Sequence, residues 1–274
     1  MKIAQISDLH VQAEGDRAYG VVDTNALVKK AIAHLNHLSP RPDCVVATGD
    51  LVHRGTVAEY EQLKSLLFDL EIPIYLLPGN HDRREHLRQV FDDCDYWPES
   101  EDYLHYAVET SELRLLMLDT VVPGEGGGEL DEARLTWLQL QLERDGDRPV
   151  IIFMHHPPFD TGIVMMDRIG LKGRDRFAEV VARHPQVERV ACGHLHRAIH
   201  CRWAGTIAST QPSLVHQVAL DFQPNAKGYF FMEPPAYTLH DWDGSSLVSH
   251  TLFVGDFDGP HPFIERQIAA GSVS

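Results

Sequence analysis

Histidine, aspartate and asparagine recur together in five short segments, which are ISDLH at 6–10, GDLVH at 49–53, GNHD at 79–82, MHHPP at 154–158 and GHLH at 193–196. Imidazole nitrogens mixed with carboxylates and one amide oxygen suit zinc, iron, manganese or cobalt, whereas calcium prefers oxygen ligands alone. Any one of these segments is also compatible with a turn, a helix cap or a strand end. Their repetition in one chain predicts a metal centre.

In each segment the polar side chains come at or just past the carboxyl end of an apolar run. Ligands bind at that edge in open α/β sheets. Two of the pairs have i, i+2 spacing, which on an extended backbone points both side chains to the same side. We therefore expect one crevice to receive Asp8, His10, Asp50, Asn80, His81, His155, His156, His194 and His196.

Seven strong candidate ligands are too many for one ion and suit two ions that share a bridging carboxylate. Asp50 is the natural bridge because it directly follows its apolar run, and Gly49 allows the backbone to turn sharply there.

Apolar runs alternate with helical patterns along the first part of the chain, which predicts an α/β sandwich. The expected strands are 2–7, 44–48, 74–77, 103–108, 113–119, 150–155 and 189–192. The expected helices are 24–36, 58–70, 131–144 and 174–184, of which the first follows Asp23, a good N-cap, and the last ends before Pro185.

After about residue 197 the pattern changes to short strands, and the Asp243-Gly244 dipeptide predicts a hairpin. This part is expected to form a small β-rich appendage whose edge strands and aromatic residues suit self-association, the aromatic residues being Trp203, Tyr229, Phe230 and Phe231. The alternative is that its strands only extend the main sheets. The turn-rich stretch that follows is irregular.

The chain has 274 residues and a formal net charge of −16, and such a surface repels a nucleic-acid polymer. No apolar run reaches the roughly 20 residues that span a bilayer, and the first residues lack a cleavable apolar stretch. We therefore expect a cytoplasmic protein with no membrane partner. Four cysteines without C-x-x-C spacing do not predict a disulfide framework.

The joint set DLH, GD, GNHD, HH and GHLH resembles the calcineurin-like metallophosphoesterases. The segments YGVVDTNA, LPGNHD, IFMHHPP, CGHLH and VHQV are similar to those of bacterial class III cyclic-nucleotide phosphodiesterases and dinuclear glycerophosphodiesterases. The resemblance implies an α/β fold, a four-layer α/β/β/α sandwich with a small β-rich appendage. It implies a catalytic domain over 1–197, a β-rich dimerisation or cap region over 198–255, and a C-terminal tail over 256–274 that returns to the catalytic domain.

Carried over position by position, the resemblance implies two divalent ions (iron, manganese, zinc or cobalt). One ion would be held by Asp50 together with Asp8, His10 and His196. The other would also be held by Asp50, together with Asn80, His156 and His194.

The resemblance also implies roles in substrate binding and catalysis. His81 would face the phosphoryl group, Asp50 and Asn80 would act with it in catalysis, and Asn80 and His216 of VHQV would contact substrate. His155 neighbours His156, and adjacent residues of a strand face opposite ways, so we expect a structural or supporting role for it.

The roles of His53 and Arg54, just after Asp50, stay open between contact with the phosphate's substituents and a solvated loop.

These features predict a dinuclear phosphodiesterase that hydrolyses small phosphodiesters, glycerophosphodiesters or cyclic nucleotides, by attack of a metal-bound hydroxide. No G-x-S-x-G elbow or cysteine–histidine motif indicates a covalent intermediate. The alternatives are a phosphomonoesterase, including a phosphoprotein phosphatase, and a scaffold without catalysis, while the acidic charge disfavours a nuclease. The dimerising part implies a homodimer or a higher homo-oligomer.

Overall fold

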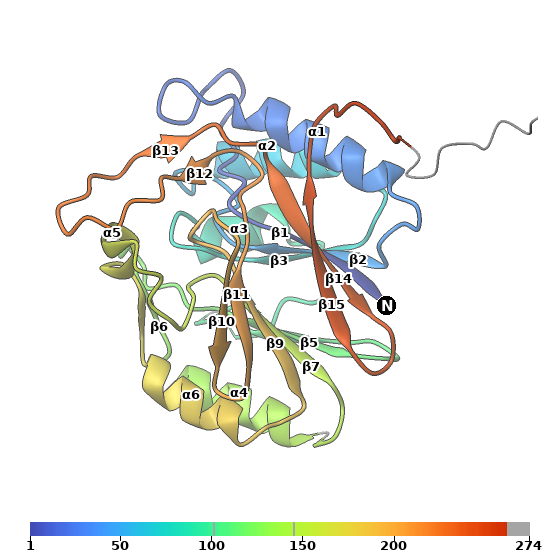
Figure 1. The fold of residues 1–274 in the computed structure, drawn as a ribbon, viewed down its shortest axis with the longest axis vertical. Helices are drawn as coiled ribbons and strands as arrows, with labels where there is room; N and C mark the ends of the chain where they lie inside the picture. Colours follow the sequence, from blue (N-terminus) through green and yellow to red (C-terminus); the bar gives the residue numbers. More distant parts are fainter. Residues whose placement is uncertain (101, 145, 262–274) are drawn as a thin grey trace, which may run out of the picture.

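The computed structural model of the protein describes residues 1–100, 102–144 and 146–261. Two β-sheets lie face to face, and a layer of helices covers the outer face of each, which makes four layers (Figure 1). Among the described helices, none combines the length and the apolarity that crossing a bilayer requires.

The first sheet has the order β15-β14-β1-β2-β3. Its strands are β1 (Lys2–Ile6), β2 (Cys44–Thr48), β3 (Ile74–Leu77), β14 (Ala236–Trp242) and β15 (Leu247–Phe253). The three N-terminal strands are parallel, and β14 joins β1 in the antiparallel sense.

The second sheet has the order β10-β11-β9-β7-β5-β4, in which the four inner strands are parallel and the two edge strands are antiparallel. Its strands are β4 (Tyr106–Glu109), β5 (Arg114–Leu118), β7 (Val150–Met154), β9 (Val187–Cys192), β10 (Ile199–Trp203) and β11 (Thr206–Thr210). Parallel strands deliver their carboxyl ends to one edge, so the loops that follow β1, β2, β3, β7 and β9 can meet there.

Two short pairs stand outside the sheets, β6 (Gly128–Glu129) with β8 (Leu171–Lys172) and β12 (Gln217–Val218) with β13 (Phe230–Phe231).

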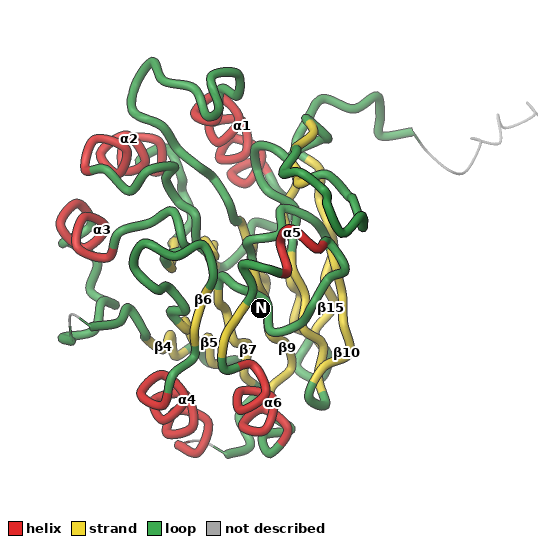
Figure 2. Tube along the Cα trace, turned by 90° about the vertical axis from the view of Figure 1, so that its left-hand side faces the viewer, coloured by secondary structure: helices red, strands yellow, loops and turns green. Residues whose placement is uncertain are grey.

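Helices α1 (Thr24–His37), α2 (Val57–Leu67) and α3 (Arg84–Val90) cover the first sheet. Helices α4 (Glu132–Arg144) and α6 (Arg174–Ala182) cover the second, on the opposite side of the molecule (Figure 2), and α5 (Val164–Asp167) is a single turn. The Asp23 carboxylate caps α1 by accepting the Ala26 N–H at 3.1 Å, as the sequence predicts.

Three apolar layers hold the fold together. Between the sheets lie Val46 and Leu77 of the first and Ile151 and Phe153 of the second, each at most 1% exposed. The other two layers lie between each sheet and its helices. Strands buried on both faces explain the nearly continuous apolar runs in the sequence.

Every strand and helix expected within residues 1–197 is present, with small shifts at the ends; β4, for example, begins at Tyr106 instead of 103. The elements that sequence patterning missed there are α3, α5, β6 and β8. Each has seven residues or fewer, too short for a period of 2 or 3.6 to repeat convincingly.

The sequence left open whether the β-rich part after residue 197 forms a separate appendage or extends the main sheets, and the structure shows some of each. Strands β10, β11, β14 and β15 extend the main sheets, and the β14–β15 hairpin turns at the predicted Asp243-Gly244. The β12–β13 pair alone stands apart from the sheets (Figure 1). Of the expected tail, residues 262–274 lie outside the described residues.

The packing of α4 generates a stability prediction with a matched control on the same helix. Leu138 is fully buried against the second sheet, whereas Leu140 is 61% exposed. We expect Leu138→Ala to lower the free energy of unfolding by about 2–5 kcal/mol and Leu140→Ala by less than about 0.5 kcal/mol. Equilibrium urea unfolding followed by circular dichroism measures both, and equal losses would contradict this orientation of the helix.

Candidate metal centre

The loops after β1 and β2 run side by side past the ends of their strands. The backbone N–H groups of Asp8 and His10 donate to the carbonyls of Gly49 and Asp50 at 3.0 and 2.9 Å. The second sheet joins this edge, because the Gly193 N–H donates to the His155 carbonyl and the His155 Nδ1–H to the Thr48 carbonyl. Segments far apart in sequence therefore lie together. The loops that follow β1, β2, β7 and β9 are here called the rim.

Five of the expected ligands have left-handed backbone conformations. Their φ angles are 54° at Asp8, 44° at His10, 48° at Asp50, 70° at His194 and 49° at His196. The sequence analysis expects extended backbone at the two i, i+2 pairs, but β1 ends at Ile6 and β9 at Cys192, before either pair begins. Such strain costs about 1–3 kcal/mol per residue and typically clusters at functional sites.

Two glycines allow the loops to approach this closely. A Cβ on Gly193 would lie 2.1 Å from the Ser7 Oγ and 3.1 Å from an Asp8 carboxylate oxygen. A Cβ on Gly79 would lie 2.4 Å from Oδ1 of Asp50. No side chain fits at either place, so any larger residue would push the carboxylates out of position.

The Asp50 carboxylate lies at the middle of the rim, and its two oxygens face different groups. Oδ2 is 3.6 Å from Nε2 of His10, whereas Oδ1 is 3.4 Å from Nε2 of His155 and accepts the His81 backbone N–H at 2.9 Å. Burial alone would raise the pKa of this carboxyl, but the imidazoles of His155 and His81 hold the pKa well below its usual range. Asp50 is therefore ionised, with Oδ2 facing His10 and Oδ1 facing His155.

Three histidines have one ring nitrogen committed to a backbone carbonyl. His155 Nδ1 faces the Thr48 carbonyl at 2.8 Å, His196 Nδ1 faces the His216 carbonyl at 2.8 Å, and His194 Nε2 faces the Ile169 carbonyl at 3.1 Å. A carbonyl only accepts, so the facing nitrogen must carry the proton. In each neutral ring the other nitrogen is then a lone-pair donor.

The other nitrogen of each ring points at an oxygen that accepts hydrogen bonds. His196 Nε2 is 3.3 Å from an Asp8 carboxylate oxygen, and the free nitrogens of His155 and His194 are 3.1 and 3.0 Å from Oδ1 of Asn80.

Burial lowers the pKa of His194 to about 3, so its ring is neutral. Burial would also lower the pKa of His155 and His196, but the Asp50 and Asp8 carboxylates raise the first to about 9 and the second above its usual value. The protons of His155 and His196 thus lie where a divalent cation would bind, and metal binding would displace them. Ligand atoms of Asp8, His10, Asp50 and His196 lie close enough together to hold one ion, and those of His155 and His194 lie close together in a second group. The donor set therefore fits divalent metals.

The two adjacent histidines of MHHPP face opposite ways, and His155 is the one that faces Asp50. Both nitrogens of His156 are engaged elsewhere, Nδ1 with the Thr120 hydroxyl at 2.7 Å and Nε2 with the Gly126 carbonyl at 3.3 Å. The sequence analysis expects the reverse. The pleat of β7 explains the difference. Phe153 points between the two sheets and Met154 points toward the helices, and side chains alternate along a strand, so His155 points to the same side as Phe153.

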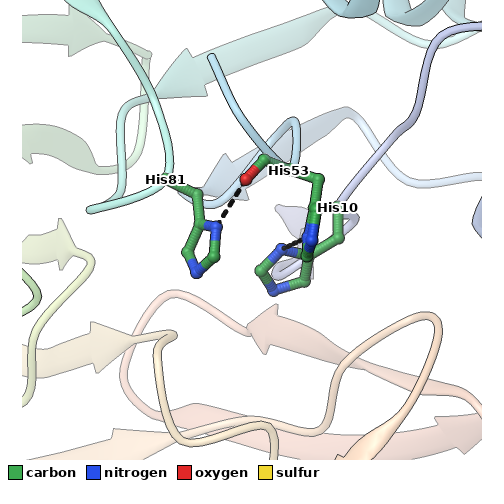
Figure 3. A group of neighbouring side chains, drawn as sticks. All are labelled: His10, His53 and His81. Carbon is green, nitrogen blue, oxygen red and sulfur yellow. Dashed lines mark hydrogen bonds between the residues drawn. The ribbon is translucent and has the colours of Figure 1, made fainter. Parts of the chain in front are cut away.

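His53 joins the rim as well. Its carbonyl accepts the His81 Nδ1–H at 2.7 Å, and its Nδ1 lies 3.5 Å from Nδ1 of His10, as Figure 3 shows. The first bond leaves Nε2 of His81 facing Oδ2 of Asp50 at 4.0 Å. The sequence left the role of His53 open, and the structure places its ring against His10 and His81.

A cavity of about 270 Å³, here called the histidine cavity, opens above the rim. His216 of VHQV lines it and packs against His10 and His196, and its Nδ1 has no partner among the described residues. Tyr19 covers it by packing edge-on against His53 and His216. The sequence analysis assigns Tyr19 no role, and its only signal was the family-like segment around it.

A second residue that the sequence analysis missed is Asp82, which braces two of the loops. Its carboxylate accepts the N–H groups of Gly79 and Leu51 at 2.8 and 3.0 Å and the Tyr60 hydroxyl at 2.9 Å. Burial and the nearby Asp50 carboxylate raise the pKa of Asp82 to about 7. Its identity as the last residue of GNHD was the available signal.

Comparison with known proteins identifies the family of the chain. The family model described as calcineurin-like phosphoesterase matches residues 1–198. A probable glycerophosphodiester phosphodiesterase from Arcobacter nitrofigilis is 41% identical over 269 residues, which cover 97% of this chain and 98% of that protein. A probable cyclic nucleotide phosphodiesterase from Rhodopseudomonas palustris is 35% identical over 278 residues, with both chains fully covered.

Among solved structures, a dimetal phosphatase from Danio rerio superimposes with a TM-score of 0.63 at 16% identity, covering 93% of this chain and 99% of that one. At that identity the likeness concerns the fold, and it agrees with the sandwich described above.

Proposed function

Because the chain belongs to the calcineurin-like phosphoesterase family, we propose that it is a metal-dependent phosphodiesterase that hydrolyses small phosphodiesters. One observation carries the proposal: the two oxygens of the buried Asp50 carboxylate face different imidazoles, Oδ2 that of His10 and Oδ1 that of His155. A carboxylate shared in this way suits a pair of ions acting on one phosphoryl group.

The ligand sets follow from the contacts around Asp50. Asp8, His10 and His196 would hold one ion together with Asp50. Asn80, His155 and His194 would hold the other, again with Asp50, because the free nitrogens of both histidines face the Asn80 amide oxygen. His155 replaces His156 in this set, since the nitrogens of His156 already bond to Thr120 and Gly126. Iron, manganese, zinc and cobalt all accept these donors.

Divalent ions bound there would neutralise the phosphoryl oxygens and activate water as the nucleophile. The chain itself supplies orientation and a proton donor. The His53 carbonyl fixes the His81 ring through Nδ1, so that Nε2 faces the rim of the site, where the side chain is 31% exposed. In its protonated form, His81 can donate a hydrogen bond to the phosphoryl oxygen or a proton to the departing alkoxide.

Small diesters are the proposed substrates. The two relatives of nearly full coverage are named for glycerophosphodiesters and cyclic nucleotides. The histidine cavity suits one arm of such a molecule, because apolar side chains line it beside the histidines, namely Met165, Met166, Ile169 and Phe230. A phosphomonoesterase on the same ligands is the alternative, and substrate tests separate the two.

A substrate panel tests the reaction. Metal-stripped protein is restored with iron, manganese, zinc or cobalt, one at a time, and assayed on bis-p-nitrophenyl phosphate, p-nitrophenyl phosphate, a glycerophosphodiester and cyclic AMP. We expect kcat/KM for the diesters to exceed that for the monoester by at least about tenfold, or about 1.4 kcal/mol of transition-state preference. Faster monoester hydrolysis would favour the phosphomonoesterase, and inactivity with every metal would favour a non-catalytic scaffold.

The neighbouring histidines provide a matched pair of variants for the ligand assignment. We expect His155→Ala to lose about one of two bound metal equivalents and nearly all activity, because it removes a nitrogen that faces Asp50 and Asn80. His156→Ala should keep both metals and lose about 10–100-fold in activity at most, because it removes a residue that only supports the loops. Elemental analysis of purified protein gives the metal content, with Asp50→Ala as the inactive reference.

Retention of both metals in His155→Ala together with metal loss in His156→Ala would refute this assignment. It would favour His156, the ligand that the family resemblance implies.

A homo-oligomer is also proposed, with the β12–β13 pair and its connecting loop as the contact surface. Large apolar side chains there are 55–62% exposed, namely Leu220, Phe222, Tyr229, Phe231 and Met232. Two aromatic residues considered for self-association in the sequence analysis instead pack internally, Trp203 against Phe177 and Phe230 against Tyr19. Exposed apolar side chains gathered on one segment in this way commonly mark a protein interface.

We expect Phe231→Glu to shift the mass measured by light scattering toward the monomer. Leu140→Glu on α4, at a site of similar exposure, is the control and should leave the mass unchanged. A monomeric wild-type protein, or dissociation only in the control, would contradict this surface.

A further inference from the structure

A second cavity of about 580 Å³, here called the arginine cavity, adjoins the histidine cavity. The two share Asn80 and His81, so both open onto the same phosphoryl site. The chain as a whole carries a net charge of −16 and only 24 lysines and arginines. Four of those cationic residues line this one cavity: Arg54, Arg83, Arg84 and Arg88.

Two of the four arginines have structural partners. Arg84 forms a bidentate ion pair with the buried Asp119 carboxylate, at 2.5 and 2.8 Å, and Arg88 donates to the Ser100 carbonyl at 2.7 Å. The guanidinium groups of Arg54 and Arg83, by contrast, have no ion pair or hydrogen bond among the described residues. They are the charges left available to a ligand.

The cavity also has acidic residues in its lining, namely Asp82, Glu85 and Asp102. Asp82 is buried and its oxygens already accept hydrogen bonds from the loops it braces. Glu85 and Asp102 are exposed. The lining is therefore mixed in charge, and the selectivity of the cavity depends on the two unpaired guanidinium groups beside His53 and His81.

The backbone under both unpaired arginines is held in place. The Arg54 N–H donates to the Glu59 carboxylate at 3.0 Å, and the next carbonyl, that of Gly55, accepts from His86 at 2.7 Å. The Arg83 N–H donates to the Tyr60 hydroxyl at 2.9 Å.

The stem of Arg83 lies over Gly55, where an added Cβ would come within 2.7 Å of the Arg83 Cγ. The Arg83 stem is thus positioned, while the charged ends of both exposed arginines have no partner among the described residues. Such preorganisation lowers the entropy cost of binding an anion.

We propose that the arginine cavity receives a substrate arm that carries a second anion, a carboxylate or a phosphate, which pairs with Arg54 and Arg83. This inference rests on the proposed phosphodiesterase function and narrows its substrate class. The reacting phosphoryl group lies at the junction of the two cavities, with one arm against the apolar side chains that line the histidine cavity and the anionic arm among the arginines. Planar guanidinium groups match both carboxylate and phosphate geometry.

The test compares three diesters that share the p-nitrophenyl leaving group and differ only in the second arm, which is ethyl, 2-carboxyethyl or 2-phosphonooxyethyl. With the metal-loaded full-length protein, we expect kcat/KM to be about tenfold higher for an anionic arm than for the ethyl arm. The carboxylate and phosphate arms separate the two sources of negative charge. Because the contact is partly exposed, the preference should decrease as salt is added.

Variants then assign the preference to these arginines. Arg54→Gln and Arg83→Gln should each reduce the preference for the anionic arm, and the double variant should abolish it. Hydrolysis of the ethyl diester should fall by a smaller factor than hydrolysis of the anionic diesters, since its only charge lies on the phosphoryl group. Arg83→Lys should restore part of the preference. Arg202→Gln on β10 is the matched control, because it removes one exposed positive charge away from both cavities.

Binding without catalysis provides an independent readout. Calorimetric titration of the same diesters into metal-stripped protein should give tighter binding of the carboxyethyl diester than of the ethyl diester, and the double variant should remove the difference. Equal kcat/KM for neutral and anionic arms, or equal effects of the variants on both, would overturn this proposal alone. Failure to hydrolyse the ethyl diester with any metal would instead overturn the phosphodiesterase function.

Discussion

The structure depends on one electrostatic constraint, the convergence of hydrogen-bond acceptors around Asp50. His155, His194 and His196 each commit one nitrogen to a backbone carbonyl, so the remaining lone pairs face carboxylate and amide oxygens. Burial of so many acceptors is costly in a low dielectric, and either protons on His155 and His196, whose pKa values are raised, or divalent cations relieve that cost. The carbonyls that fix the rings belong to loops of both sheets, so the fold sets the protonation pattern.

The backbone of the rim is strained, and the rest of the fold holds it. Left-handed conformations at Asp8, His10 and Asp50 would not persist in an isolated peptide. They are held by ladder-like hydrogen bonds between the two loops and by the Asp82 carboxylate. The burial of three apolar layers stabilises the fold and offsets the free-energy cost of this strained backbone.

Charge is distributed unevenly over the molecule, and that distribution connects metal binding with substrate choice. A strongly acidic chain gathers imidazoles at one rim and arginines in the adjoining cavity. A small anion is therefore attracted at short range, where the guanidinium groups of Arg54 and Arg83 lie, while the net charge opposes a large polyanion. The apolar side chains that line the histidine cavity add a preference for an apolar substrate arm.

The sequence by itself determined the alternation of strands and helices, the Asp23 cap of α1 and the types of residue at five strand ends. These are local properties, readable from periodicity and from the chemistry of each side chain. It did not determine which histidine of MHHPP faces Asp50, because that depends on which side of β7 packs between the sheets. Nor did it indicate that His53 and Tyr19 lie against the rim or that Arg54 and Arg83 line one cavity. Only the tertiary structure decided these points, because they depend on how distant loops pack across two sheets.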